Sequence, residues 1–97
     1  MAIKHVAWFI FKEGVSLEQI DKHLTACRGL VGKVPSLDSL ECGPNISDRA
    51  GGFTHGIVVQ VKDKAALEAY LNHPVHIPIA KALVDDIAEL RVMDIQV

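Results

Sequence analysis

Residues 3–11 constrain the fold of this chain most strongly, because large apolar side chains occur on both parities of the segment. Ile3, Ala7, Phe9 and Phe11 share one parity, and Val6, Trp8 and Ile10 share the other. Side chains alternate between the two faces of a β-strand, so this segment predicts a strand with two apolar faces. Helices cover one face of a sheet, and the simplest cover for the other is a second copy packed about a twofold axis, with about 800 Å² buried per subunit.

The size and charge of the chain exclude several classes of protein. Its 97 residues suit a single domain, 1–97, built around one core. The net charge of -2 comes from twelve acidic and ten basic residues scattered along the chain, so we expect no binding to nucleic acid or to an anionic membrane. The apolar share of 49% is large for one small core, which also favours a homodimer.

Cysteine usage and the absence of long apolar stretches predict a soluble, cytoplasmic protein. Cys27 and Cys42 are isolated in the sequence, which encodes neither a zinc site nor a framework of disulfides and fits a reducing compartment. No apolar run approaches the roughly eighteen residues of a membrane span, and the N-terminus lacks the cleavage site of a signal peptide.

The segment after the first strand predicts a long amphipathic helix from Ser16 to about Val31. Ser16 is a good N-cap, and Gln19 is placed to reach back to it as in a capping box. Gly32 and Pro35 should end the helix. The expected buried stripe is Leu17, Ile20, Leu24, Cys27, Leu30 and Val31.

The rest of the chain alternates strand and helix patterns. We expect a strand in the first part of 36–46, a mobile loop over 43–52, and a strand over 53–61 that places Phe53, His55, Ile57, Val59 and Val61 on one face. A helix capped by Asp63 should follow, bury Ala66, Leu67, Tyr70 and Leu71, and end at His73-Pro74. The chain should close with a helix from Pro74 or Pro78 to about Ala88 and a strand over 90–97. This order predicts an α+β ferredoxin-like sandwich with one four-stranded antiparallel sheet.

A phenol and two imidazoles converge within seven residues at the proline break, in Tyr70, His73 and His76. Such groups exchange protons near neutral pH, so this is a candidate site for proton transfer. The structural alternative is that these histidines only cap the helix ends, that Tyr70 only fills the core and that His5 and His55 are a solvated strand end and a satisfied interior histidine. A metal site is disfavoured, because no carboxylate or cysteine stands at ligand spacing.

Two further features receive structural interpretations. Asp85, Asp86 and Glu89 predict a solvated acidic patch near the end of the last helix. Trp8 lies on the parity opposite to His5, which favours a role as an anchor in the dimer interface.

Several blocks in a fixed order resemble the stress-responsive A/B barrel domain family, the dimeric α+β barrels abbreviated Dabb. The blocks are Ile3-Lys4-His5-Val6, Phe11-Lys12-Glu13-Gly14-Val15-Ser16, residues 30–35, Gly43-Pro44-Asn45-Ile46-Ser47, Gly52-Phe53-Thr54-His55 and residues 69–76. The resemblance covers nearly the whole chain. It implies the ferredoxin-like fold and a homodimer whose two sheets face each other.

The resemblance also implies a candidate chemistry. An enzymatic member of the family closes a linear polyketide thioester by an aldol condensation without a cofactor, using a tyrosine and a histidine. Tyr70 and His76 match that catalytic pair, and His5, His55 and His73 match further histidines, which makes them candidate substrate-binding residues. In such a site His76 would be the base, Tyr70 would stabilise the enolate oxygen, and His5 or His55 would hold His76 in the required tautomer.

The sequence therefore supports three functional hypotheses. The leading hypothesis is a homodimer that binds a small, largely apolar ligand between sheet and helices, with cyclase-like proton-transfer chemistry and no cofactor. The second is a non-catalytic stress-response or structural dimer. The third is a cofactor-free monooxygenase of the related dimeric α+β barrels, which we expect if Trp8 or His5 lines the cavity.

Overall fold

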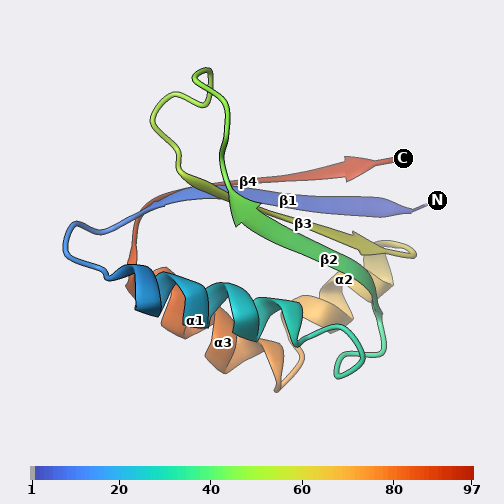
Figure 1. The fold of residues 1–97 in the computed structure, drawn as a ribbon. Coiled ribbons are helices and arrows are strands. Elements are labelled where there is room, and N and C mark those ends of the chain that lie inside the picture. The colour runs from blue at the N-terminus through green and yellow to red at the C-terminus, as the bar shows by residue number, and fades with distance from the viewer. Residues whose placement is uncertain (1) are drawn as a thin grey trace.

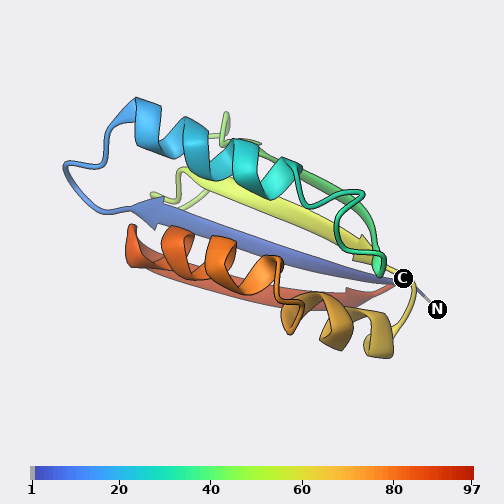
Figure 2. The same cartoon turned by 90° about the horizontal axis from the view of Figure 1, so that it is seen from below.

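The computed structural model describes residues 2–97, which form a four-stranded antiparallel sheet with three helices on one face (Figure 1). The elements are β1 (Ile3–Phe11), α1 (Leu17–Arg28), β2 (Leu37–Pro44), β3 (His55–Val61), α2 (Lys64–Leu71), α3 (His76–Asp85) and β4 (Ile87–Gln96). The strand order is β2-β3-β1-β4. Seen from the helix side, α1 runs over the β2–β3 half of the sheet and α3 over the β1–β4 half (Figure 2). The predicted ferredoxin-like fold is confirmed.

Helix α1 begins as the sequence predicts but uses Gln19 differently. Ser16 Oγ accepts a hydrogen bond from the Gln19 backbone N–H at 3.1 Å, so Ser16 is the N-cap. The Gln19 side chain, however, lies 3.4 Å from both His23 Nε2 and Asp86 Oδ2, so the second half of the predicted capping box is wrong. The helix ends at Arg28, and Gly32 has a positive φ of 90° in the turns that follow.

The predicted apolar stripe of α1 is correct only in its middle. Leu24, Cys27 and Leu30 are buried, whereas Leu17 is 84% exposed and Val31 is 45% exposed. Leu17 is the first helical residue and lies beyond the edge of the core, and Val31 lies in the turn after the helix has ended.

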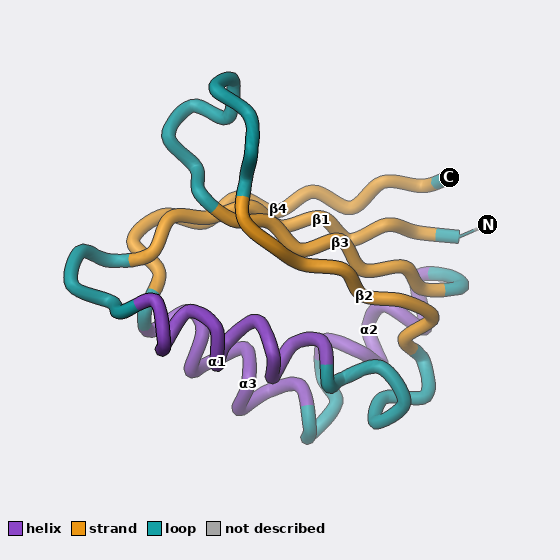
Figure 3. The backbone as a smooth tube through the Cα atoms, viewed as in Figure 1, coloured by secondary structure: helices purple, strands orange, loops and turns teal. Residues whose placement is uncertain are grey.

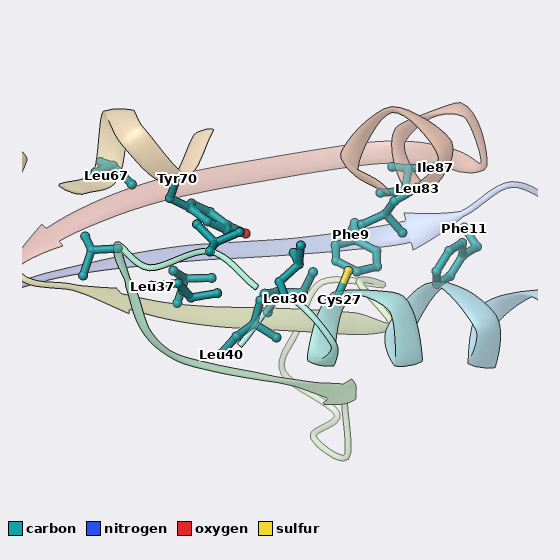
Figure 4. Close-up of a cluster of buried hydrophobic side chains, with 14 residues drawn as sticks. Phe9, Phe11, Cys27, Leu30, Leu37, Leu40, Leu67, Tyr70, Leu83 and Ile87 are labelled. Carbon is teal, nitrogen blue, oxygen red and sulfur yellow. The ribbon is translucent and has the colours of Figure 1, made fainter. Parts of the chain in front are cut away.

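The core lies between the sheet and the helices (Figure 4). Phe9 and Phe11 project from β1 into this layer with ring centroids 5.4 Å apart, and Val59 and Val61 project from β3. The predicted inward parity of both strands is therefore confirmed. Phe53 departs from it, because this residue precedes β3 and packs edge-on against Trp8 with ring centroids 6.4 Å apart.

The second face of the sheet, which we call the open face, carries no helix among residues 2–97 (Figure 1). Val6, Trp8 and Ile10 of β1 lie on it and are only partly buried. The strand register places Val58 and Met93 on either side of Val6, and both are exposed. The loop between β2 and β3 projects away from the helices on this side (Figure 3). The open face thus carries an exposed apolar surface around Val6, and Lys4 and Arg91 share this face.

The C-terminal third differs from the prediction in its boundaries. Asp63 caps α2 by accepting a hydrogen bond from the Ala66 N–H at 2.8 Å, as predicted. Leu67 and Tyr70 are buried as predicted, but Leu71 is exposed. The last helix ends at Asp85 and β4 already begins at Ile87, so the predicted helix end near Ala88 and strand start at Leu90 are wrong. No helix within the described part of the chain is long and apolar enough to cross a membrane.

Candidate functional site

A cavity of about 240 Å³ lies between the sheet and the helices. It is lined by His5, Ala7, Phe9, Cys27, Leu30, Ile57, Tyr70, Leu71, His76, Ile79, Ala80, Leu83, Val84, Ile87, Leu90 and Val92. Only His5, Cys27, Tyr70 and His76 bring polar side-chain atoms to this lining, and none of the described lining residues is a lysine, arginine or carboxylate. The cavity therefore suits a small, largely apolar molecule.

The break between α2 and α3 brings Tyr70 and His76 together. The His73 N–H donates to the Tyr70 carbonyl at 3.2 Å and the His76 N–H donates to the His73 carbonyl at 3.0 Å, which closes two successive tight turns. As a result the rings of Tyr70 and His76 lie with centroids 4.3 Å apart and an interplanar angle of 44°. The two residues that the resemblance pairs are thus direct neighbours on the cavity wall.

A backbone carbonyl sets the protonation of His76. Its Nδ1 lies 3.1 Å from the Leu71 carbonyl oxygen, which accepts only, so Nδ1 carries the proton and the neutral ring has a lone pair on Nε2. Burial lowers the pKa of His76 below its ordinary value of 6.5, the bond to Leu71 opposes this, and His5 and His73 lower the pKa further. His76 is therefore a neutral base at physiological pH.

Tyr70 has the complementary state. Its side chain reaches from α2 into the core layer (Figure 4), and the residue is only 4% exposed. Burial raises the pKa of the Tyr70 phenol well above its ordinary value of 10, with a smaller contribution from Cys27. The phenol therefore keeps its proton at neutral pH and is a hydrogen-bond donor.

His5 lines the same cavity from β1. Its ring lies edge-on to Tyr70, with centroids 6.3 Å apart, and its Nδ1 lies 2.5 Å from Oδ1 of Asp94 on β4. We expected His5 or His55 to fix the tautomer of His76, but the Leu71 carbonyl occupies that position. Asp94 was not predicted, because its proximity to His5 follows from the register of β1 and β4, which local sequence patterns do not specify.

The other two candidate histidines lie outside the cavity lining. His55 stacks on Phe9 with centroids 6.1 Å apart, its Nδ1 lies 2.8 Å from Thr54 Oγ1, and burial lowers its pKa. It borders a separate hollow of about 560 Å³ beneath the β2–β3 loop, which Trp8 also lines. His73 Nδ1 accepts a hydrogen bond from the Val75 N–H at 3.1 Å, so its imidazole supports the turn.

A fifth histidine has a partner that the sequence did not reveal. His23 is buried on α1, stacks on Phe11, and places Nε2 2.6 Å from Oδ2 of Asp86. The prediction that Asp86 lies in a purely solvated acidic patch is therefore wrong. Residues 2–97 contain no group of three or more His, Cys, Asp or Glu side chains placed to hold a metal ion.

Comparison with known proteins gives relatives that match most of the chain. The chain is 28% identical over 94 residues to a stress-response A/B barrel domain-containing protein of Arabidopsis thaliana, covering 95% of this chain and 86% of that one. It is 24% identical over 79 residues to olivetolic acid cyclase of Cannabis sativa, covering 79% of this chain and 78% of that one.

Solved structures share the fold. A hydroxynitrile lyase from Passiflora edulis superposes with a TM-score of 0.92 at 21% identity, covering 99% of this chain and 93% of that one. A dimeric ferredoxin-like protein from Thermobifida fusca superposes with a TM-score of 0.89 at 23% identity, covering 100% and 92%. The model of the Stress Responsive A/B Barrel Domain matches residues 3–97. The chain belongs to the stress-responsive A/B barrel domain (Dabb) family.

Proposed function

We propose that this protein is a homodimer that binds a small, largely apolar carbonyl compound between sheet and helices and transfers protons to and from it without a cofactor. The observation that carries the proposal is the pairing of Tyr70 and His76 at a ring distance of 4.3 Å on the wall of an otherwise apolar cavity. A buried donor beside a neutral base is the arrangement that enolate chemistry needs.

Each group has one task in this chemistry. Nε2 of His76 removes a proton from the carbon next to a carbonyl, because Nδ1 is already committed to Leu71. The Tyr70 hydroxyl donates a hydrogen bond to the carbonyl oxygen as negative charge develops there. The apolar lining strengthens that hydrogen bond by excluding water. The name of one similar protein, a cyclase, supports this class of reaction.

The open face supports the proposal of a homodimer. Val6, Trp8, Ile10, Val58, Met93 and Ile95 would leave a large apolar area in water, and a second copy packed face to face would cover it. The fold neighbour from Thermobifida fusca is described as dimeric, which supports this arrangement.

The proposal is tested by α-proton exchange, which requires no knowledge of the natural substrate. Heptane-2,6-dione is incubated in D₂O with the protein, and deuterium uptake is followed by mass spectrometry. We expect His76→Ala to lower the protein-catalysed exchange at least tenfold, or about 1.4 kcal/mol, with the dimer intact. Lys81→Ala on the same helix is the matched control. Exchange by the wild type no faster than in buffer would refute the proposal.

Two alternative functions predict different experimental results. A non-catalytic stress-response dimer would show neither exchange nor a bound small molecule when the purified protein is screened by mass spectrometry. A cofactor-free monooxygenase has one supporting observation, because His5 lines the cavity although Trp8 lies on the open face. Oxygen consumption with the same diketone would favour the monooxygenase.

A further inference from the structure

His5 and Asp94 form a second polar pair at the cavity, joined across two strands. The two residues are register partners on β1 and β4, and His5 Nδ1 lies 2.5 Å from Asp94 Oδ1. An ionised carboxylate only accepts hydrogen bonds, so Nδ1 of His5 carries a proton and donates it to Asp94. Asp94 itself is about half exposed, while the His5 side chain is largely enclosed.

The two imidazoles at the cavity differ in the group that accepts the hydrogen bond from Nδ1. A neutral backbone carbonyl holds His76, whereas a carboxylate holds His5. A carboxylate at hydrogen-bond distance stabilises the positively charged form of an imidazole far more than a carbonyl does. The phenol ring of Tyr70 is in ring contact with both imidazoles. The cavity therefore brings an imidazole held by a carbonyl and an imidazole held by a carboxylate to the same phenol.

We propose that the Asp94-supported imidazole of His5 is the general acid of this site, that His76 is its base, and that Asp94 is the positioning residue of His5. The inference rests on the function proposed above and assigns separate roles to the two histidines. It applies to reactions in which a second carbonyl becomes an alkoxide, as in an intramolecular aldol closure.

The proton balance of such a closure is complete without an external reagent. His76 Nε2 takes the α-proton, and the enolate carbon forms a bond to the carbon of the second carbonyl. The π electrons of that carbonyl move to its oxygen, which receives the proton from the His5 imidazolium. His76 then returns its proton to His5 through the Tyr70 hydroxyl or water, which restores both groups. The net reaction is an isomerisation of the diketone to a cyclic β-hydroxyketone.

Heptane-2,6-dione separates the two roles in one molecule. Exchange of its α-protons needs only the base and the hydroxyl of Tyr70, whereas ring closure also needs an acid. Both rates are measured on the same sample, by mass spectrometry for exchange and by NMR for the cyclic product. We expect Asp94→Asn to lower the rate of closure at least tenfold more than the rate of exchange. His5→Gln should lower the ratio of the closure rate to the exchange rate in the same way. Combining His5→Gln with Asp94→Asn should lower this ratio little further, because the two residues act as one unit.

The controls distinguish failure of this inference from failure of the proposed function. Asp38→Asn removes an exposed carboxylate on β2, the opposite edge of the sheet, and should leave the ratio of the two rates unchanged. Thermal unfolding confirms that each variant is folded. Equal losses of exchange and closure in Asp94→Asn, or no loss of closure, would overturn the role of the His5–Asp94 pair. Absence of exchange in the wild type would instead overturn the proposed function.

Discussion

His23 on α1 and Asp86 in the turn between α3 and β4 form a hydrogen bond, with His23 Nε2 2.6 Å from Asp86 Oδ2. The two residues are 63 positions apart in the sequence. The hydrogen bond from His23, with a smaller contribution from Gln19, lowers the pKa of Asp86 below its ordinary value of 3.8. Because His23 is buried and stacked on Phe11, its polar edge requires this partner.

The pair predicts a specific acid sensitivity. A carboxyl group whose pKa is lower in the folded state stabilises the fold above its unfolded pKa, and this stabilisation is lost as the pH falls through the folded value. Asp86→Asn should therefore unfold at lower temperature than the wild type at pH 7, and the difference should shrink as the pH falls below about 4. Circular dichroism melts across this range test the prediction. A constant difference between the two proteins at all pH values would contradict it.

The exposure of the first residue of α1 and of a residue in the turn after α1 predicts unequal results for two leucine substitutions. Leu30 is 1% exposed, so Leu30→Ala should lower the free energy of unfolding by about 2–5 kcal/mol. Leu17→Ala should change it by less than about 0.5 kcal/mol, because Leu17 lies in solvent. Urea denaturation measures both. Similar losses in the two variants would mean that Leu17 is covered in solution.

The buried position of His76 predicts the pH dependence of proton exchange. Burial lowers its pKa below 6.5, so the neutral base predominates at neutral pH. The exchange rate of heptane-2,6-dione should be level above pH 6.5 and should fall as the pH decreases through the lowered pKa. Tyr70→Phe should lower the level portion of this curve without moving its midpoint upward. A midpoint at or above 6.5 in the wild type would show that a different base is at work.

The open face predicts the effect of a charge at Trp8. Trp8→Glu places a carboxylate within the apolar surface and should give monomer or aggregate in size-exclusion chromatography with light scattering. Leu17→Glu adds the same charge on α1, away from the open face, and should leave a dimer. A dimer in both variants would assign the interface to another surface.

Burial predicts unequal reactivity of the two thiols. Burial raises the pKa of Cys27 to about 11 and raises that of the less buried Cys42. Thiolate is the reactive form, so iodoacetamide at pH 8 should label Cys42 well before Cys27. Peptide mass spectrometry reads the order directly, and prior labelling of Cys27 would contradict the buried position of its thiol.

Local patterns in the sequence determined the order of the elements and the sides they bury. The alternation in residues 3–11 and 55–61, the cap residues Ser16 and Asp63, and the break at His73-Pro74 each act over a few residues, and the structure follows all of them. The same patterns placed Tyr70 and His76 close together, because only two successive tight turns separate them. The ends of the elements were less well predicted. Leu17, Val31 and Ile87 fit the apolar pattern of a helix whether or not the helix includes or buries them, so the pattern does not mark the boundary.

The tertiary structure alone decided which polar groups meet. His5 and Asp94 are 89 residues apart and His23 and Asp86 are 63 residues apart, so their contacts depend on strand register and on the packing of α1 against the last turn. The tautomer of His76 depends on the position of the Leu71 carbonyl at the end of α2. Hydrogen bonds of this kind act over about 3 Å, whereas the hydrophobic pattern fixes side chains only to a face of an element.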